Sequence, residues 1–338
     1  MCAGAVIGGG FASGRETISF FTQYGRYGWW LIVLSVGVMV LLALTCMRET
    51  AKTKCECWCG LYDDLPKWQS ICARVCAMMM MVVTGGAMLS AAGHMVELLW
   101  PWTGAYAVGL VGTALLAWLA GHGRMRLLSW ISAVLSALML AAVLAVLAGV
   151  PSGAQNVTFD SENHFGLWAA LRAVAYAAMN MTLAIGVVCR CSRYSRRGIS
   201  RTAILLGFLL LALLFVSQYL YLRHSEIKDE VFPIVKLLSA FGRGGFLLSV
   251  ILLYLAVFTT LAAVLYGLRT AVEGYVRQPW AQVLLWLGLP LAISCIGFSE
   301  IVNRLYAPAG LGCLVLVFGP VLFRRFGKNS LDNQSGIQ

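Results

Sequence analysis

Long runs of apolar residues recur from one end of the chain to the other, and lysines and arginines concentrate between them. A run of about 20 apolar residues is long enough to form an α-helix across a hydrocarbon core of about 30 Å. The pattern therefore predicts an all-α polytopic membrane protein. The ten expected spans are residues 1–24, 28–47, 69–99, 104–121, 127–149, 166–189, 201–222, 245–274, 280–301 and 304–323.

The first of these runs contains a stretch that is poorly suited to a continuous membrane helix. Four glycines fall within residues 8–14, and Arg15 and Glu16 follow directly. Each glycine inside a helix costs about 1 kcal/mol relative to alanine, and a charge near the bilayer centre costs at least about 2.5 kcal/mol. An interrupted helix is tolerated in lipid where it is buried in protein or lines a water-filled cavity. The break therefore indicates a solute or ion site, and hence a transporter.

The segment that precedes this break is short. Seven residues come before Gly8, which is about 10 Å of helix, whereas half of the hydrocarbon core measures about 15 Å. We therefore expect either that Met1 is an internal or misassigned start, or that the chain is a truncated version of a longer protein.

Ten spans divide into two halves of five, and the second half then enters the membrane from the opposite side. This predicts a 5+5 inverted repeat in which the first span of each half, spans 1 and 6, is broken. The signal is weaker in span 6, where Asn180 and Thr182 place an amide and a hydroxyl at mid-membrane and Gly186 is the one helix breaker. The expected units are a first repeat at 1–149, an external connection at 150–165, a second repeat at 166–325 and a polar cytoplasmic tail at 326–338.

The basic residues of the connections predict the orientation. With the amino terminus cytoplasmic, 16 lysines and arginines of the connections lie inside and six lie outside. The positive-inside rule therefore predicts a multi-pass protein of the plasma membrane with both termini cytoplasmic. The external connection at 223–243 contains the run PIVKLL at 233–238, whose spacing suits a short amphipathic helix.

Composition supports the same class of protein. Of the 338 residues, 60% are hydrophobic and 12% are charged, and the mean hydropathy is +0.81. Soluble domains carry about twice that charged fraction, so the chain has no room for a sizeable soluble domain. The formal net charge of +11 is not arranged as a basic stripe with interleaved aromatic residues, which excludes a nucleic-acid partner. The absence of a P-loop, nucleophile elbow, HExxH or dinucleotide motif disfavours an enzyme.

The eleven cysteines lie mostly in expected spans or in connections placed on the cytoplasmic side, where thiols stay reduced. Cys55, Cys57 and Cys59, and Cys189 with Cys191, have C-x-C spacing instead of the C-x-x-C spacing usual for zinc, and no histidine is near them in sequence. We therefore expect neither an extracellular disulfide framework nor a metal site.

The break in span 1 offers groups that suit a polar solute. A helix that begins near Ser13 or Gly14 presents free N–H groups and a positive end to an anionic group, and glycines allow a ligand to approach the backbone closely. The alternative for these glycines is tight packing against neighbouring helices. The expected substrate-binding residues are Gly9, Gly10, Phe11, Ser13, Gly14, Glu16, Tyr176, Asn180 and Thr182.

Glu16 is the most informative of these residues because it places a carboxyl group within the membrane. It could hold a cation, take up a coupling proton or bind a substrate amine. It could instead form a structural ion pair with Arg15, Arg74 or Arg172.

A second acidic group lies in span 3. His94 and Glu97 are three residues apart and share a helix face. They could relay protons, or they could form a structural pair at the membrane interface. The candidate proton relay comprises Glu16, His94 and Glu97.

Thr259 and Thr260 place two hydroxyl groups at the middle of span 8. Such hydroxyls can supply neutral oxygen ligands to a hard cation such as Na⁺. Threonines in membrane helices also commonly bond to the carbonyl four residues earlier, so a purely structural role is the alternative.

The run VIGGGFASGRETISFF at residues 6–21 closely resembles the opening of the YkvI-type uncharacterised membrane proteins. That family usually shows a GAGFASGQE-like run, so Gly9 stands in place of alanine and Arg15 in place of glutamine. The family looks like a branch of the amino acid–polyamine–organocation superfamily with the LeuT-type fold, which implies a 5+5 inverted repeat.

The resemblance also implies a cation site. In sodium-coupled members of that fold, one Na⁺ lies between carbonyls of the first span and hydroxyls of the eighth. Gly4 and Ile7 match the carbonyl donors, and Thr259 and Thr260 match the hydroxyl pair.

The leading hypothesis is a secondary active transporter of a small polar organic solute, an amino acid or related amine, driven by Na⁺ or H⁺ through alternating access. The alternative is a non-transporting receptor on the same fold, since germination-receptor subunits resemble this superfamily. The expected partners are the lipid bilayer and a small-molecule substrate, and no cofactor is expected apart from the coupling ion.

Overall fold

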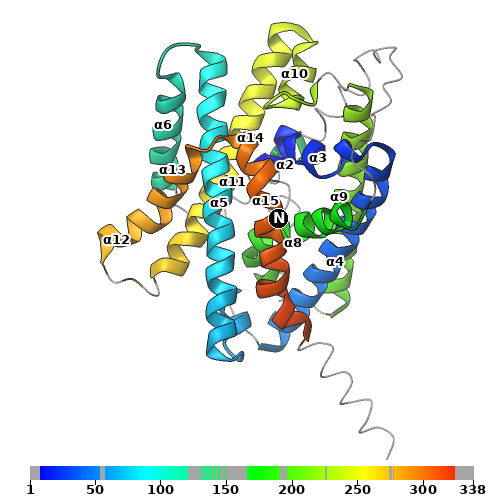
Figure 1. The fold of residues 1–338 in the computed structure, drawn as a ribbon, viewed down its shortest axis with the longest axis vertical. Coiled ribbons are helices and arrows are strands. Elements are labelled where there is room, and N and C mark those ends of the chain that lie inside the picture. The colour runs from blue at the N-terminus through cyan, green and yellow to red at the C-terminus, as the bar shows by residue number, and fades with distance from the viewer. Residues whose placement is uncertain are drawn as a thin grey trace, which may run out of the picture.

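In the computed structural model, almost every described residue is helical and none forms a β-strand (Figure 1). This agrees with the all-α class that the apolar runs predict. The structure describes residues 8–53, 58–120, 166–190, 196–224, 227–273, 276 and 278–323, together with isolated positions between 131 and 149.

Long helices form the body of the bundle, and most of them run side by side along its long axis (Figure 1). Among the described residues, six segments are long and apolar enough to cross a membrane, and residues 105–119 and 280–294 form shorter apolar helices. The chain is therefore a multi-span membrane protein. The long helices are α4 (Gly28–Thr53), α5 (Lys67–Leu99), α6 (Ala105–Ala120), α8 (Leu167–Arg190), α9 (Arg196–Arg223) and α11 (Gly242–Glu273).

These eight apolar segments correspond to the second to fourth and the sixth to tenth expected spans. The fifth expected span, 127–149, lies largely outside the described residues, as do the expected external connection at 150–165 and the tail at 326–338. The count of ten spans therefore stays a prediction.

The chain changes direction within the first expected span. Helix α2 (Gly9–Ser13) ends at Gly14, whose φ of 82° is left-handed, and α3 (Arg15–Phe20) begins at the next residue. A residue in the left-handed conformation commonly ends a helix, and glycine adopts this conformation without steric cost. A short 3₁₀ helix, η1 (Thr22–Tyr27), then leads into α4. Helix α2 contacts α11, and α3 contacts α8 and α9.

The prediction of a break in span 6 is wrong. Helix α8 is continuous, and the polar side chains at its middle bond within the helix. Asn180 donates to the carbonyl of Tyr176 at 3.0 Å, and Thr182 donates to the carbonyl of Ala178 at 2.8 Å. Because these groups are satisfied locally and the surrounding sequence is rich in alanine, the helix tolerates Gly186 at a cost of about 1 kcal/mol.

The predicted amphipathic helix in 223–243 is present as α10 (Pro233–Ser239). Its apolar residues Ile234, Val235, Leu237 and Leu238 are buried, whereas Lys236 is exposed. The helix packs against the start of α11 and also contacts α2.

The last two apolar segments contain π-helical stretches. Pro290 and Pro308 have no N–H to donate to the carbonyls four residues earlier, at Trp286 and Arg304, and both of these residues lie in π-helical stretches. The elements are α12 (Pro279–Val283), η5 (Leu284–Gly288) and α13 (Leu289–Ser294), then α14 (Phe298–Glu300), η6 (Ile301–Leu305), α15 (Tyr306–Gly312) and η7 (Cys313–Phe318).

Helix α8 is held between α4 and α15 in the interior of the bundle. A Cβ on Gly310 of α15 would overlap the carbonyl oxygen of Ala175, so the two backbones are in direct contact. Close approach through small residues is the usual way in which membrane helices pack. This contact holds the backbone of α8 at Ala175 against the backbone of α15 at Gly310.

Candidate functional site

The first turn of α2 packs directly against α11. A Cβ on Gly9 would lie 2.7 Å from the Cα of Val257, so a side chain does not fit between the two helices. The Gly9 N–H donates a 2.9 Å hydrogen bond to Oγ1 of Thr260. The preceding N-cap residue, Gly8, has no side chain. Helix α11 therefore satisfies one of the N–H groups that the start of α2 leaves without a helical partner.

The other two glycines of the break leave space for side chains of the protein itself. A Cβ on Gly10 would overlap the carboxyl group of Glu16, and a Cβ on Gly14 would overlap the hydroxyl of Tyr221 on α9. In this structure the glycines of the expected substrate site thus contact protein atoms, as tight packing requires. Their role in substrate binding stays a prediction.

Phe11 and Ser13 are buried within the break. The Ser13 hydroxyl donates to the Gly10 carbonyl at 2.6 Å and accepts from the Arg15 N–H at 3.1 Å. The Gly14 N–H donates to the Phe11 carbonyl at 3.0 Å. These bonds satisfy backbone groups at the interruption, so the break is a defined turn.

The Glu16 side chain lies in the interior of the bundle, where the residue is 5% exposed. The Tyr176 hydroxyl on α8 donates a hydrogen bond to its carboxyl group. Tyr306, the first residue of α15, lies close enough to Glu16 to interact with its charge. Asn180 lies one turn beyond Tyr176 on α8. Helix α8 thus contributes a hydrogen bond to this carboxyl group, and α15 places a second tyrosine in its surroundings.

Arg15 points away from Glu16. Its guanidinium donates to the backbone carbonyls of Lys228 and Glu230, at 2.6 Å and 3.3 Å, in the segment that precedes α10. The side chain therefore ties α3 to the connection between α9 and α10.

The other two arginines that could pair with Glu16 also have different partners. Arg172 on α8 donates to the carbonyl and the hydroxyl of Ser19, at 3.1 Å and 3.3 Å. Arg74 on α5 forms an ion pair with Asp63. A structural ion pair of Glu16 with these arginines is therefore wrong, and within the described part of the chain no basic side chain pairs with Glu16.

Two aromatic rings pack against the ring of Tyr176, whose hydroxyl binds Glu16. The ring centroid of Tyr176 lies 5.1 Å from that of Phe20 and 5.0 Å from that of Phe21. Arg172 lies over the Phe20 ring, 5.5 Å from its centroid. Edge and tilted contacts of this kind fix ring positions, so the Tyr176 hydroxyl is held in place against α3.

Two buried hydroxyls near Glu16 have no hydrogen-bond partner among the described residues. They belong to Thr84 on α5 and to Tyr306. The two side chains lie close to each other. Buried polar atoms are nearly always bonded to protein or to water. These hydroxyls therefore give the surroundings of Glu16 a capacity to bind a small polar molecule.

The expected hydroxyl ligands of the cation site both bond within α11. Thr259 and Thr260 donate to the carbonyl of Ala256 at 3.0 Å and 2.9 Å, as the structural alternative expects. Thr260 also contacts the first segment through Gly9. The expected carbonyl donors, Gly4 and Ile7, lie outside the described residues. The cation site stays a prediction.

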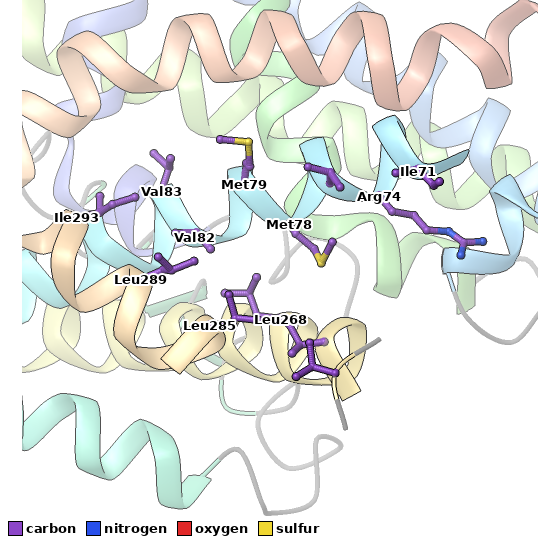
Figure 2. A pocket seen from close by; sticks show the side chains of 13 residues that line it. Ile71, Arg74, Met78, Met79, Val82, Val83, Leu268, Leu285, Leu289 and Ile293 are labelled. Atoms are coloured by element: carbon purple, nitrogen blue, oxygen red, sulfur yellow. The ribbon is translucent and has the colours of Figure 1, made fainter. Parts of the chain in front are cut away.

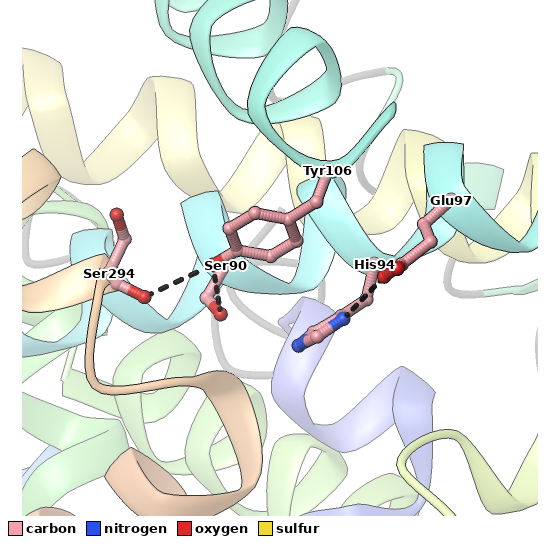
Figure 3. A network of polar contacts seen from close by, with 5 residues as sticks. All are labelled: Ser90, His94, Glu97, Tyr106 and Ser294. Carbon is pink, nitrogen blue, oxygen red and sulfur yellow. Dashed lines mark hydrogen bonds and ion pairs between the residues drawn. The ribbon is translucent and has the colours of Figure 1, made fainter. Parts of the chain in front are cut away.

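His94 and Glu97 form a pair, with Nδ1 and Oε2 3.3 Å apart near the end of α5 (Figure 3). The His94 ring lies 4.8 Å from the Tyr106 ring of α6. The Tyr106 hydroxyl contacts that of Ser90 at 3.0 Å and donates to the Ser294 carbonyl at 3.2 Å. The pair thus lies beside a network that joins α5, α6 and α13, and among the described residues no chain of hydrogen bonds links it to Glu16.

The described part of the chain includes two of the five cysteines with C-x-C spacing, Cys59 and Cys189. Cys55, Cys57 and Cys191 lie outside the described residues, and Cys189 is buried. In the part of the chain that the structure describes, no three His, Cys, Asp or Glu side chains are grouped so that they could hold a metal ion.

Comparison with known proteins gives distant relatives that match nearly the whole chain. No family model matches it. The uncharacterised membrane protein YkvI of Bacillus subtilis (strain 168) is 23% identical over 333 residues, covering 93% of this chain and 91% of YkvI. The uncharacterised protein YyaD of the same strain is 22% identical over 330 residues, covering 95% and 94%. The chain is a distant homologue of the YkvI-type proteins.

A solved structure shows which fold this homologue of YkvI has. The inward-facing conformation of Mhp1, a LeuT-fold transporter, matches with a TM-score of 0.59 and 14% sequence identity. The match covers 96% of this chain and 74% of Mhp1. The YkvI homologue therefore has the LeuT fold, as the resemblance of its first span implies.

Sequence reasoning missed two residues of the site in this YkvI homologue. Thr84 on α5 and Tyr306 on α15 are far from Glu16 in sequence, and the fold brings them together in a way that the sequence does not show. Weak signals exist, because Thr84 precedes Gly85 and Gly86, and Tyr306 stands two residues before a proline. Such signals mark close packing and irregular helix, not a site.

Proposed function

We propose that this protein is a secondary active transporter on the LeuT fold that carries a small polar organic solute, an amino acid or related amine, with Na⁺ or H⁺. The solute would bind between the break in the first span and the middle of α8. Alternating access would move it across the membrane. The observation that carries this proposal is the buried carboxyl group of Glu16, which has no basic partner among the described residues.

A buried charge of this kind demands compensation. Removing a carboxylate from water costs several kcal/mol even after the protein relaxes, and one hydrogen bond from Tyr176 does not offset that cost. A proton, a metal cation or a substrate amine would. Each of these makes occupancy of the site depend on a cation, which is the requirement for coupled transport.

The surroundings of Glu16 support a substrate with further polar groups. The hydroxyls of Thr84 and Tyr306 can donate and accept, and both are buried without a partner among the described residues. A small solute with an amine and a second polar group would satisfy Glu16 through the amine and these hydroxyls through the other group. Asn180 lies on α8 and Ser13 on α2, the two helices between which the solute would bind.

The LeuT fold supports the finer parts of the proposal. The first repeat would comprise 1–149 and the second 166–325, with both termini cytoplasmic in the plasma membrane. A Na⁺ would lie between carbonyls of Gly4 and Ile7 and hydroxyls of Thr259 and Thr260. The contact between α2 and Thr260 is consistent with this placement, because it brings the eighth span to the break.

Transport by purified protein in liposomes tests the proposal. A panel of amino acids and amines is offered under an inward Na⁺ gradient, an inward H⁺ gradient and no gradient. We expect accumulation of at least one solute under one of the gradients. Glu16→Gln should abolish this accumulation, since a neutral amide no longer requires a cation.

Glu49→Gln is the matched control. Glu49 is also buried, but it pairs with Lys52 at 2.6 Å, so its loss should leave accumulation intact. No transport of any solute under either gradient would refute the proposal. Stabilising binding of a solute without any flux would favour the receptor alternative.

A further inference from the structure

A groove opens between α5, the C-terminal end of α11 and the helix formed by η5 and α13 (Figure 2). Its volume is about 610 Å³, within the range of about 300–1,000 Å³ that is usual for ligand pockets. Arg74 is the one polar residue of its lining, so we call it the Arg74 groove. The residues used below are Ile71, Arg74, Met78, Val82, Val83 and Ile293.

The groove exists because the helices touch at one end. A Cβ on Gly85 would lie 3.2 Å from the Cβ of Pro290, and a Cβ on Gly86 would lie 2.6 Å from Cγ2 of Ile293. The glycines bring α5 and α13 into close contact at this point. The lining of the groove starts beside the contact at Val83 and continues along α5, away from the contact, to Ile71.

The length and charge of the groove match one acyl chain with its head group. From Ile71 to Val83 the helix rises about 18 Å, close to the half-thickness of about 15 Å of a hydrocarbon core. Figure 2 shows Arg74 with Ile71 at one end of the row of side chains and Ile293 with Val83 at the other. The groove is therefore apolar over the length of one leaflet, with a positive charge at one end.

The groove faces outward, toward the surroundings of the bundle. Ile71, Val75 and Met79 on its α5 wall are 59%, 44% and 64% exposed. In a membrane protein such exposed apolar side chains contact lipid. The most abundant molecule that reaches this surface is a phospholipid, and an acyl chain can enter the groove without leaving the hydrocarbon region.

The guanidinium of Arg74 has the chemistry to hold a phosphate. It carries five N–H donors in a planar fork, and its ion pair with Asp63 engages Nη2. Asp63 is an exposed partner, with 65% of its side chain accessible, so solvent and counter-ions weaken its hold. Phosphate can therefore compete with Asp63 for the guanidinium.

We propose that the Arg74 groove binds one acyl chain of an anionic phospholipid, and that Arg74 holds the phosphate of its head group. The site is separate from the surroundings of Glu16, and the inference does not depend on the proposed transport activity.

Native mass spectrometry of the purified protein in detergent tests the proposal. The protein is titrated with phosphatidylglycerol or with phosphatidylcholine of the same acyl chains. We expect a single tight adduct with about fivefold preference for phosphatidylglycerol, the contribution typical of one basic residue near a lipid surface. Arg74→Gln should remove the preference, and Arg74→Lys should retain part of it. Arg201→Gln, which removes an exposed arginine of α9, should leave the preference unchanged.

Filling the groove tests the apolar part of the site. Val82→Trp should weaken binding of both lipids, whereas Val108→Trp on the exposed face of α6 should weaken neither. Equal binding of the two lipids to the unaltered protein, or the same loss from Arg201→Gln as from Arg74→Gln, would overturn the proposal. A dimer that Val82→Trp dissociates would also overturn it, because the occupant would then be a second copy of the chain.

Discussion

The bond between Gly9 and Thr260 makes a quantitative prediction about how the break in the first span is held. Thr260→Val keeps the shape of the side chain but removes the acceptor at 2.9 Å from the Gly9 N–H. A buried N–H left without a partner costs about 1–3 kcal/mol. The loss of the bond from Thr260 to Ala256 adds little, since that carbonyl is also engaged within its helix.

Thr259→Val is the matched control. Its hydroxyl donates to the same Ala256 carbonyl, but its removal leaves the Gly9 N–H paired. We therefore expect Thr260→Val to lower the free energy of unfolding by about 1–3 kcal/mol, and Thr259→Val and Thr260→Ser to lower it by much less. Thermal unfolding of the purified variants in detergent measures the difference.

The same variants separate this structural role from ion binding. If Thr260 only satisfies the start of α2, Thr260→Val destabilises the protein equally with and without Na⁺. If Thr260 also binds Na⁺, the stabilisation that Na⁺ gives to the unaltered protein disappears in the variant. Equal destabilisation by Thr260→Val and Thr259→Val would refute the reasoning about the Gly9 bond.

Four further substitutions test the contacts that hold the break. In Gly10→Ala the added Cβ would overlap the Glu16 carboxyl group and displace it, which should lower the free energy of unfolding by about 1–3 kcal/mol. Solute binding measured by calorimetry should weaken, and unchanged binding would contradict this. Arg15→Gln removes bonds from a charged donor, so hydrogen exchange at residues 227–232 should speed up, and unaltered exchange would count against that contact. Gly14→Ala should destabilise the protein by more than about 1 kcal/mol, because residue 14 has a left-handed φ. Adding Tyr221→Phe removes the hydroxyl that the new Cβ overlaps, so the double variant should recover part of this loss in melting experiments.

The positions of the apolar helices follow from the sequence because the bilayer sets their length and composition. The turn at Gly14 is also foreseeable, since the glycines and charges around it disfavour a straight helix. The break expected in α8 fails for a local reason. Asn180 and Thr182 satisfy their side chains on carbonyls of the same helix, which a polar residue in an apolar run does not reveal.

The partners of the charged residues depend on tertiary structure. Arg15 stands next to Glu16 in sequence, yet it reaches carbonyls more than 200 residues away. Arg172 and Arg74 likewise bond elsewhere, so the isolation of Glu16 becomes visible only in the folded chain. Thr84 and Tyr306 join the site for the same reason.

The π-helical stretch η6 has a consequence for the surroundings of Glu16. Tyr306 follows η6 directly, so its position depends on how many residues the preceding turn holds. Conversion of η6 to regular α-helix would shift the register by one residue, which is a rotation of about 100° and a translation of about 1.5 Å. The Tyr306 hydroxyl would then leave the neighbourhood of the carboxyl group while α3 and α8 stayed in place. A change of helical register far along the chain could thus add or remove one polar wall of the site.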